Sequence, residues 1–351
     1  LENGQAFPGV HCGAEADTVG ELVFTTGMTG YLETLTDPSY YGQIVMQTFP
    51  LIGNYGVIPG DFESAHSHVR AYIVRDLCAD PSNFRAAGAL SEWLRTEGVP
   101  CLAGVDTRQL TRIVRERGVM NAVLSAEPVL SDAHKRALRN YRVREAVESV
   151  TCKQSFSEGQ GRRVVLCDYG AKANIRRELV KRGCEVVTVP GRTPAAEILA
   201  LHPDGIMLSN GPGDPKECES IIREIRKLYE TDIPIFAICL GHQLLALSQG
   251  AKTAKLKYGH RGANQPAKDV KTGLSYMTSQ NHGYAVDCDT LPENASLRFV
   301  NGNDGTCEGV DYTDMPAFSV QFHPEACGGP LDTRFLFDRF IAMMGGNKEC
   351  R

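Results

Sequence analysis

The sequence predicts an α/β protein with two domains. Its 351 residues exceed what one ordinary hydrophobic core holds. In the C-terminal part, short apolar runs alternate with helical segments, which is typical of βαβ units around a mostly parallel central sheet. The N-terminal part is rich in turns and differs in style. We therefore place an N-terminal α/β domain over residues 1–150, a linker over 151–162 and a second domain over 163–347.

Clusters of Gly, Pro and Asn, such as TDPSYYGQ and CADPSNFRAAG, separate the short elements expected in the N-terminal domain. Extended segments are expected at 21–25 and 43–48. Helices are expected in ALSEWLRTEG and DTRQLTRIVRERG, and Gly118 ends the second after a charged last turn. The segment TCKQSFSEGQGR at 151–162 is polar and aperiodic, and for that reason it is predicted to be the linker.

The C-terminal domain alternates between two kinds of segment. The expected strands are RRVVLCDYG, CEVVTVP, DGIMLSNGPGDP and IPIFAICLG. The expected helices between them are ANIRRELVKRG, TPAAEILALH and ESIIREIRKLYET. Ligands of such sheets bind outside the carboxyl ends of the strands, where DYGAK, NGPGDP and CLGHQ lie. No GxGxxG motif is present there, so a dinucleotide site has no support.

Composition excludes several classes of function. A net charge of −5, with 42% hydrophobic and 23% charged residues, gives no electrostatic footprint for nucleic acid or a membrane surface. The 12 cysteines include no CxxC pair and no Cys/His run at zinc spacing, which argues against a structural zinc site and for a reducing compartment, expected to be the cytoplasm. An initiator Met and a signal-peptide layout are both missing from LENGQAFPG, so we expect the chain to begin a little inside its natural N-terminus.

Cys239 lies where the apolar run IPIFAI meets a helical segment. This strand–turn–helix order is that of a nucleophile elbow, with Ala237 and Gly241 as the small residues on either side. The start of the helix would favour a thiolate, and the amide of Leu240 would face a developing oxyanion. The alternative is a buried cysteine that acts as a small hydrophobe, and the local motif leaves both open.

A thiolate nucleophile needs an acid/base partner. His323 follows a strand-like run, and Glu325 two positions later can point the same way because Pro324 keeps the segment extended. His242, on the helix after the elbow, and His282, in SQNHGYAVD, are rivals. The glycines of LSNGPGDP indicate either a plain turn or close backbone approach to a ligand, and local sequence does not decide between them.

Taken together, NGPGDP, CLGHQ and HPE resemble, in this order, the class I (triad) glutamine amidotransferases over roughly residues 163–345. That resemblance implies hydrolysis of glutamine to glutamate and ammonia. It further implies Cys239 as the nucleophile, His323 as the base and Glu325 as the carboxylate that orients it. Gly211 and Gly213 match the loop that holds the substrate and its oxyanion.

The N-terminal half carries a second resemblance. GELVFTTGMTGYLETLTDPSYYGQ and GVDTRQLTRIVRERG look like the amino-terminal domain of the carbamoyl phosphate synthetase small subunits. Ser39 of this domain would then contribute to a site at the domain interface. The glutamine contacts implied by the resemblance are Ser39, Gly211, Gly213, Leu240, Gln243, Asn281, Gly283 and Tyr284. Departures from the family pattern are Ala237, Tyr284 where Phe is frequent, and Cys327 after the triad.

The resemblance also implies a partner. Ammonia would pass to a large subunit, in a heterodimer or a higher oligomer, and ATP and Mg would bind there with bicarbonate to form carbamoyl phosphate for arginine or pyrimidine biosynthesis. No cofactor and no metal are expected in this chain, which has no GxxxxGK[ST] motif. Three alternatives stay open: an inactive assembly or regulatory homologue, an amidotransferase of another biosynthetic pathway, and an unrelated thiol hydrolase.

Overall fold

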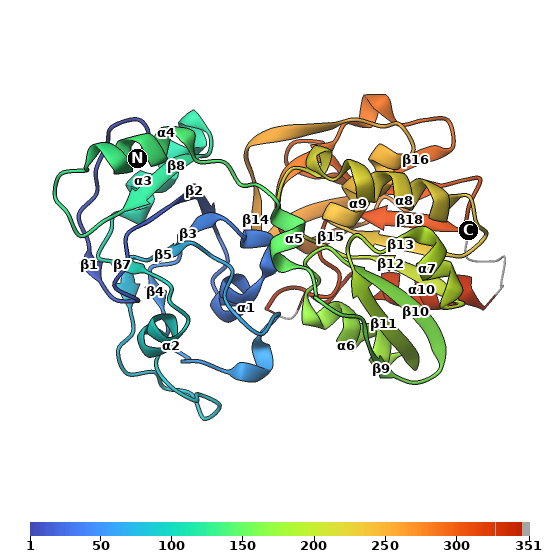
Figure 1. Ribbon diagram of the computed structural model, residues 1–351, viewed down its shortest axis with the longest axis horizontal. Coiled ribbons are helices and arrows are strands. Elements are labelled where there is room, and N and C mark those ends of the chain that lie inside the picture. Colours follow the sequence, from blue (N-terminus) through green and yellow to red (C-terminus); the bar gives the residue numbers. More distant parts are fainter. Residues whose placement is uncertain (327, 346–351) are drawn as a thin grey trace. The chain divides into compact units, whose positions relative to one another are not determined.

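The computed structural model describes residues 1–326 and 328–345, so Cys327 lies outside the described residues. The chain divides into two compact units, Leu1–Ala146 and Val147–Arg351, and each is described by itself (Figure 1). Both units combine helices with sheets, which confirms the predicted α/β class. Within the described part, no helix has the length and apolarity needed to cross a membrane.

Unit 1 contains a six-stranded sheet in the order β1-β7-β5-β3-β2-β8. Its four inner strands pair in parallel, and β1 and β8 add antiparallel edges. The strands are β1 (Val10–His11), β2 (Thr18–Thr25), β3 (Gln43–Gln47), β5 (Ala71–Ile73), β7 (Cys101–Ala103) and β8 (Met120–Leu124), with β4 (Leu51–Ile52) and β6 (Asp76–Leu77) in a separate pair. The helices are α1 (Tyr31–Thr36), α2 (Leu90–Thr96), α3 (Thr107–Arg117) and α4 (Asp132–Asn140), and α5 (Ala146–Val150) spans the unit boundary.

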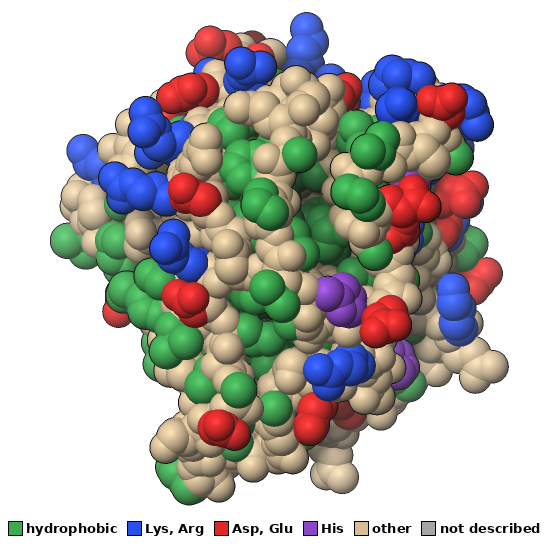
Figure 2. Space-filling model, turned by 90° about the vertical axis from the view of Figure 1, so that its left-hand side faces the viewer, with side chains coloured by type: hydrophobic (Ala, Val, Ile, Leu, Met, Phe, Trp, Pro, Cys, Tyr) green, Lys and Arg blue, Asp and Glu red, His purple; other side chains and the backbone are tan. Residues whose placement is uncertain are grey.

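The elements expected in unit 1 form for the reasons read from the sequence. Alternate residues of β2 and β3, such as Val23 and Val45, pack on α1 and α2 in one core. Asp106 caps α3 by accepting the backbone N–H of Gln109, and Gly118, with φ of 94°, ends the helix. Charged side chains of both signs are interspersed on the face in Figure 2, in keeping with the small net charge.

Unit 2 is built on a ten-stranded sheet in the order β15-β14-β16-β17-β18-β13-β12-β10-β11-β9. The stretch from β18 to β11 is parallel, as predicted, and the strands on either side of it are antiparallel. The parallel strands are β10 (Arg162–Asp168), β11 (Cys184–Pro190), β12 (Gly205–Leu208), β13 (Ile235–Ile238) and β18 (Ala317–Val320). The antiparallel ones are β9 (Phe156–Gly159), β14 (Thr253–Asp269), β15 (Ser275–Val286), β16 (Ala295–Asn301) and β17 (Cys307–Tyr312).

Helices cover both faces of this sheet. Val165 and its equivalents on neighbouring strands pack with α7 (Ala195–Ala200), α8 (Glu219–Tyr229) and α9 (Leu240–Ser248). Val164 and its equivalents point the other way and pack with α6 (Ala173–Lys181) and α10 (Phe335–Met344) (Figure 1). Because both faces are buried, the central strands are continuously apolar rather than alternating.

The boundary between the units differs from the one expected. It falls between Ala146 and Val147, and the predicted linker 151–162 belongs to unit 2. Residues 156–159 form β9, which pairs antiparallel with β11 at the sheet edge. An edge strand is polar on its exposed positions, so its sequence does not show the apolar run of an inner strand.

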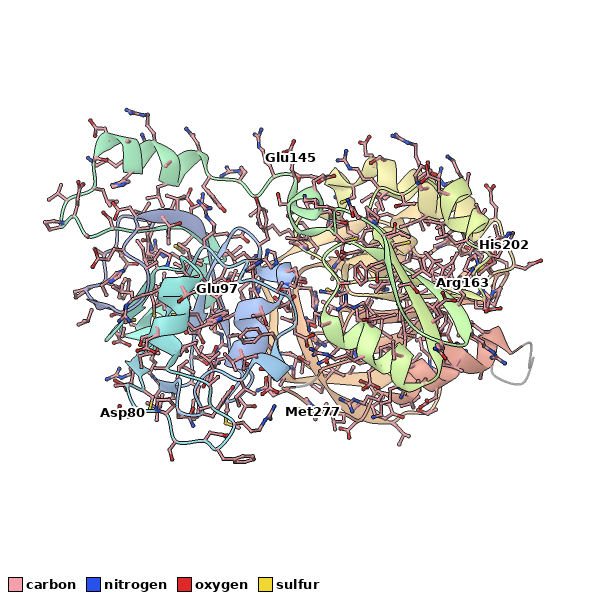
Figure 3. The ribbon with its side chains drawn as sticks, turned by 60° about the horizontal axis from the view of Figure 1, so that its bottom comes forward. Asp80, Glu97, Glu145, Arg163, His202 and Met277 are labelled. Carbon is pink, nitrogen blue, oxygen red and sulfur yellow. The ribbon has the colours of Figure 1, made fainter. Side chains whose placement is uncertain are left out.

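Arg163 and His202 mark the amino-terminal edge of the parallel strands (Figure 3). Arg163 lies at the start of β10, and its guanidinium donates to the backbone carbonyl of Leu201, next to His202. The carboxyl ends of β10, β12, β13 and β18 therefore meet at the opposite edge, where Asp168–Lys172, Ser209–Gly213, Cys239 and His323 follow.

Candidate active site

Cys239 joins β13 to α9 in a strained conformation. Its φ of 53° and ψ of −104° lie in a region that a residue with a Cβ adopts at a cost of about 1–3 kcal/mol. The backbone is held there by its neighbours, because the N–H of Cys239 donates to the carbonyl of Val320 at 2.8 Å on adjacent β18. The geometry is that of the nucleophile elbow predicted from the sequence.

The glycines around the elbow have a steric reason. A Cβ on Gly241 would lie 2.4 Å from the carbonyl oxygen of Leu208, and one on Gly211 would lie 2.2 Å from that of Tyr169. Gly213 has φ of 94°, which favours glycine. Ala237, in the leading position of the elbow, is completely buried.

The Cys239 thiol is 2% exposed, and its Sγ lies 3.7 Å from the backbone oxygen of Asn281 on β15. Leu240 is the first residue of α9, and the first amides of a helix have no intrahelical acceptor. The sulfur is thus placed between a helix start and the β15 segment that contains Asn281, Gly283 and Tyr284.

His323 and Glu325 form the contact expected from their spacing. Nδ1 of His323 lies 2.7 Å from Oε1 of Glu325, and both side chains are fully buried. A carboxylate accepts only, so Nδ1 bears the hydrogen and Nε2 of the neutral ring is left as the basic nitrogen. Among the described residues, Nε2 has no hydrogen-bond partner. This arrangement suits a general base whose second nitrogen is oriented by an acid.

Lys172 is a participant that sequence reasoning missed. Its Nζ lies 3.4 Å from Oε1 of Glu325, with both side chains buried. Burial raises the pKa of Glu325, but the charges of His323 and Lys172 and the hydrogen bond from His323 outweigh it and lower that pKa to about 2. The signal available was the lysine of DYGAK at a predicted strand end.

Hydrogen bonds fix the loop that contains Lys172. The backbone N–H of Lys172 donates to Oδ1 of Asn210 at 3.0 Å, and that of Tyr169 donates to Oγ of Ser209 at 2.9 Å. The loops after β10 and β12 are therefore joined beside Gly211 and Gly213.

The two rival histidines are engaged elsewhere. His242 is fully buried, its Nδ1 lies 2.8 Å from Oγ of Ser319, and burial lowers its pKa to about 3. His282 has Nδ1 2.7 Å from the carbonyl of Tyr284 and Nε2 3.2 Å from Oε1 of Gln280. Of the three, His323 is the one with a carboxylate partner at 2.7 Å.

The other residues with an expected glutamine contact fall in both units. Gln243 of α9 donates through Nε2 to the carbonyl of Tyr284 at 2.8 Å and to Oε1 of Gln321 at 2.9 Å, so both its hydrogens hold protein groups. Ser39 belongs to unit 1, in the turn Pro38–Tyr40, where it is buried and its N–H donates to Oδ1 of Asp37 at 2.9 Å.

A further buried cluster, which sequence reasoning did not single out, consists of residues 260, 282 and 308. His260, His282 and Glu308 come from three antiparallel strands, and only His282 had been considered, as a rival base.

Comparison with known proteins gives matches over both units. Residues 165–343 match the family model of class-I glutamine amidotransferases, and residues 1–124 match that of the carbamoyl-phosphate synthase small chain, CPSase domain. The carbamoyl phosphate synthase small chain of Listeria monocytogenes serotype 4b (strain F2365) is 50% identical, covering 99% of this chain and 97% of the relative. Those of Symbiobacterium thermophilum and Bacillus caldolyticus are 49% and 48% identical, each over 98% of this chain and over 97% and 95% of the relative.

Proposed function

The chain belongs to the carbamoyl-phosphate synthase small-chain family, and we propose that it hydrolyses L-glutamine through a cysteine thioester and delivers the ammonia to a large subunit. The observation that supports this most is the buried contact of 2.7 Å between His323 and Glu325, at the same sheet edge as the thiol of Cys239. Enzymes that transfer acyl groups use a strained cysteine at a nucleophile elbow together with a histidine that is oriented by a carboxylate.

In the proposed reaction, Cys239 gives its thiol proton to Nε2 of His323, and the resulting thiolate attacks the carboxamide carbon of glutamine to form a tetrahedral adduct. The amide of Leu240 and those of the Gly211–Gly213 loop stabilise its oxyanion. His323, protonated at Nε2, gives that proton to the leaving nitrogen, so ammonia departs and a glutamyl thioester remains. Water then loses a proton to His323 and attacks the thioester, which releases glutamate and restores the thiolate.

Glu325 is proposed to act through His323. Its carboxylate holds the hydrogen on Nδ1 and stabilises the imidazolium that forms in each step. Lys172 keeps this carboxylate ionised, in agreement with the lowered pKa of Glu325. The low pKa of His242 makes that histidine a poor base.

Glutamine is proposed to contact Ser39, Gln243, Asn281, Gly283 and Tyr284 in addition to the oxyanion groups. Both hydrogens of Gln243 Nε2 are donated to protein acceptors, one of them the carbonyl of Tyr284. We therefore propose that Gln243 also positions Tyr284. The large subunit is proposed to bind ATP, Mg and bicarbonate and to form carbamoyl phosphate, while this chain needs no cofactor for hydrolysis.

The test is ammonia release from glutamine by the purified chain, with and without a carbamoyl phosphate synthase large subunit. We expect slow release that the partner stimulates and that Cys239→Ser abolishes. Asparagine in place of glutamine should yield no ammonia. Release that persists in Cys239→Ser would refute the nucleophile, and release that ignores the partner would indicate an amidotransferase for another pathway.

Cys167→Ser is the matched control. Cys167 is a buried thiol on β10 of the same sheet, and burial raises its pKa to about 12, so it is an inert thiol at neutral pH. The same change of sulfur to oxygen there should leave ammonia release intact. A loss in both variants would mean that core damage, rather than a missing nucleophile, explains the result.

A further inference from the structure

A second cluster of polar side chains lies in the antiparallel part of the unit 2 sheet. Nδ1 of His260 (β14) lies 3.5 Å from Oε1 of Glu308 (β17), and Nε2 of His282 (β15) lies 4.0 Å from the same oxygen. One ligand atom from each residue lies within 4.8 Å of the other two. The side chains are buried, and the imidazoles meet edge to face at 4.9 Å.

The outward nitrogen of each imidazole contacts an acceptor. Nε2 of His260 lies 2.8 Å from Oδ2 of Asp304, and Nδ1 of His282 lies 2.7 Å from the carbonyl of Tyr284. These oxygens accept only, so the outward nitrogens bear the hydrogens. Burial lowers the pKa of His282, so its inward nitrogen directs a lone pair toward Glu308. Burial opposes protonation of His260 too, but Glu308 and Asp304 outweigh it and raise the pKa of that ring, so a metal ion would displace a proton from its inward nitrogen. Histidines that bind metals are held in this way by a carboxylate or a carbonyl.

Gln280 adds another acceptor. The hydroxyl of Thr278 donates its one hydrogen to the carbonyl of Gln265 at 2.7 Å, so its oxygen must accept from Nε2 of Gln280 at 3.1 Å. This fixes the amide of Gln280 with Oε1 toward His282, 3.2 Å from Nε2. A lone pair thus faces a lone pair, an arrangement that a cation between them relieves.

The carboxylate of Glu308 is only partly satisfied. Asn301 donates through Nδ2 to Oε1 at 3.0 Å and lies 3.4 Å from Nδ1 of His260. The second oxygen, Oε2, is buried and has no hydrogen-bond partner among the described residues, and Glu308 is fully buried. A buried carboxylate oxygen with no partner is costly unless a proton or a cation reaches it.

We propose that His260, His282 and Glu308 form a zinc-binding site. Two imidazole nitrogens and a carboxylate are ligands that Zn²⁺ accepts, and a tetrahedral ion sets ligand atoms about 3.3 Å apart. The contact of 3.5 Å already suits this, and the contact of 4.0 Å needs a small inward shift. The side chain of Asp304 is 44% exposed, so the His260 end of the cluster lies near solvent.

The zinc site acts on the glutamine site through β15, a consequence that rests on the proposed function. His282 lies between Asn281, whose carbonyl contacts Sγ of Cys239 at 3.7 Å, and Tyr284, whose carbonyl contacts both His282 and Gln243. Drawing Nε2 of His282 toward a metal shifts this segment. Zinc therefore lowers the glutaminase rate without binding the thiol.

Cobalt titration of the full chain in the Cys239→Ser background tests the site, with Zn²⁺ then used to displace Co²⁺. We expect one site with visible ligand-field bands and no sulfur-to-cobalt charge-transfer band. His260→Gln and Glu308→Gln should each weaken binding about 100-fold or more, since even loss of an outer-shell partner costs 10–100-fold. The matched controls His202→Gln and Glu293→Gln should bind as the parent does.

Asp304→Asn provides a second test in case a variant of one of the three ligands does not fold. It leaves the three ligands in place and should weaken cobalt binding about tenfold or more. It should also weaken zinc inhibition of ammonia release in the chain with Cys239 intact. Cobalt binding needs no glutamine, so this result stands whether or not the chain hydrolyses glutamine.

Two outcomes would overturn the proposal. One is a cobalt titration that shows no binding site, or only a site whose spectrum has the sulfur-to-cobalt charge-transfer band. That result would mean that a proton, and not a metal ion, occupies the cluster. The other is unchanged affinity in Glu308→Gln and Asp304→Asn alike.

Discussion

Replacing Lys172 with methionine tests whether the buried ion pair holds Glu325 in its ionised form. Nζ and Oε1 are 3.4 Å apart, a distance at which two unit charges attract by about 5 kcal/mol at an effective dielectric constant of about 20. Desolvation of the ammonium offsets part of this. Removal of one partner from a buried pair costs about 3–5 kcal/mol, because the other charge is left uncompensated.

We expect the lower end of that range for Lys172→Met. The hydrogen bond of 2.7 Å from His323 to Glu325 survives the substitution and still stabilises the carboxylate. The free energy of unfolding in urea should fall by about 3 kcal/mol. Lys181→Met is the matched control, since Lys181 is exposed at the end of α6 and its loss should change stability by less than about 0.5 kcal/mol.

A double-mutant cycle separates the ion pair from other effects of losing Lys172. In Glu325→Gln the charge is gone, so adding Lys172→Met there should cost about 2 kcal/mol less than it does in the parent. Purely additive losses would refute the ion pair as the reason for the lowered pKa of Glu325. So would a Lys172→Met protein as stable as the Lys181→Met control.

Two further predictions concern the elbow helix. Because burial lowers the pKa of His242 to about 3, the unfolded chain binds a proton below pH 6.5 that the folded chain does not, so stability falls on acidification. Relative to His242→Gln, the parent should lose about 1.4 kcal/mol between about pH 7.5 and 5.5 in urea unfolding, and a constant difference would contradict a buried neutral ring. Gly241→Ala places a Cβ 2.4 Å from a backbone oxygen, so it should lower the free energy of unfolding by about 1–3 kcal/mol and abolish glutamine hydrolysis. Gly88→Ala is the control, because a Cβ there meets open space and should leave the melting temperature unchanged. Equal shifts in melting temperature for the two variants would contradict the steric argument.

Local sequence was sufficient for the parts of the site that local geometry determines. The elbow at Cys239 follows from an apolar strand, a helix start and Gly241, and the structure has that geometry. The contact between His323 and Glu325 agrees with their i, i+2 spacing, but the expected extended backbone was wrong, because Pro324 and Glu325 lie in a turn in which the N–H of Ala326 donates to the carbonyl of His323 at 3.3 Å. The roles assigned to these residues stay predictions until activity is measured.

Features that depend on register between distant strands could not be read in the same way. Lys172 reaches Glu325 because β10 and β18 end at the same edge of the sheet, and the sequence around Glu325 shows only His323 as a partner for its charge. The predicted linker failed for a related reason, since β9 gains its conformation by pairing with β11.

The cluster of His260, His282 and Glu308 shows most clearly what spacing rules omit. The absence of a Cys/His run argues against a zinc site closed within one loop, but three antiparallel strands bring these ligands together through register alone. The same strand, β15, presents Asn281 to the thiol of Cys239 and His282 to Glu308 on consecutive residues. The contact with the thiol is made by the backbone carbonyl of Asn281 and the contact with Glu308 by the side chain of His282, so a shift of this backbone segment alters both.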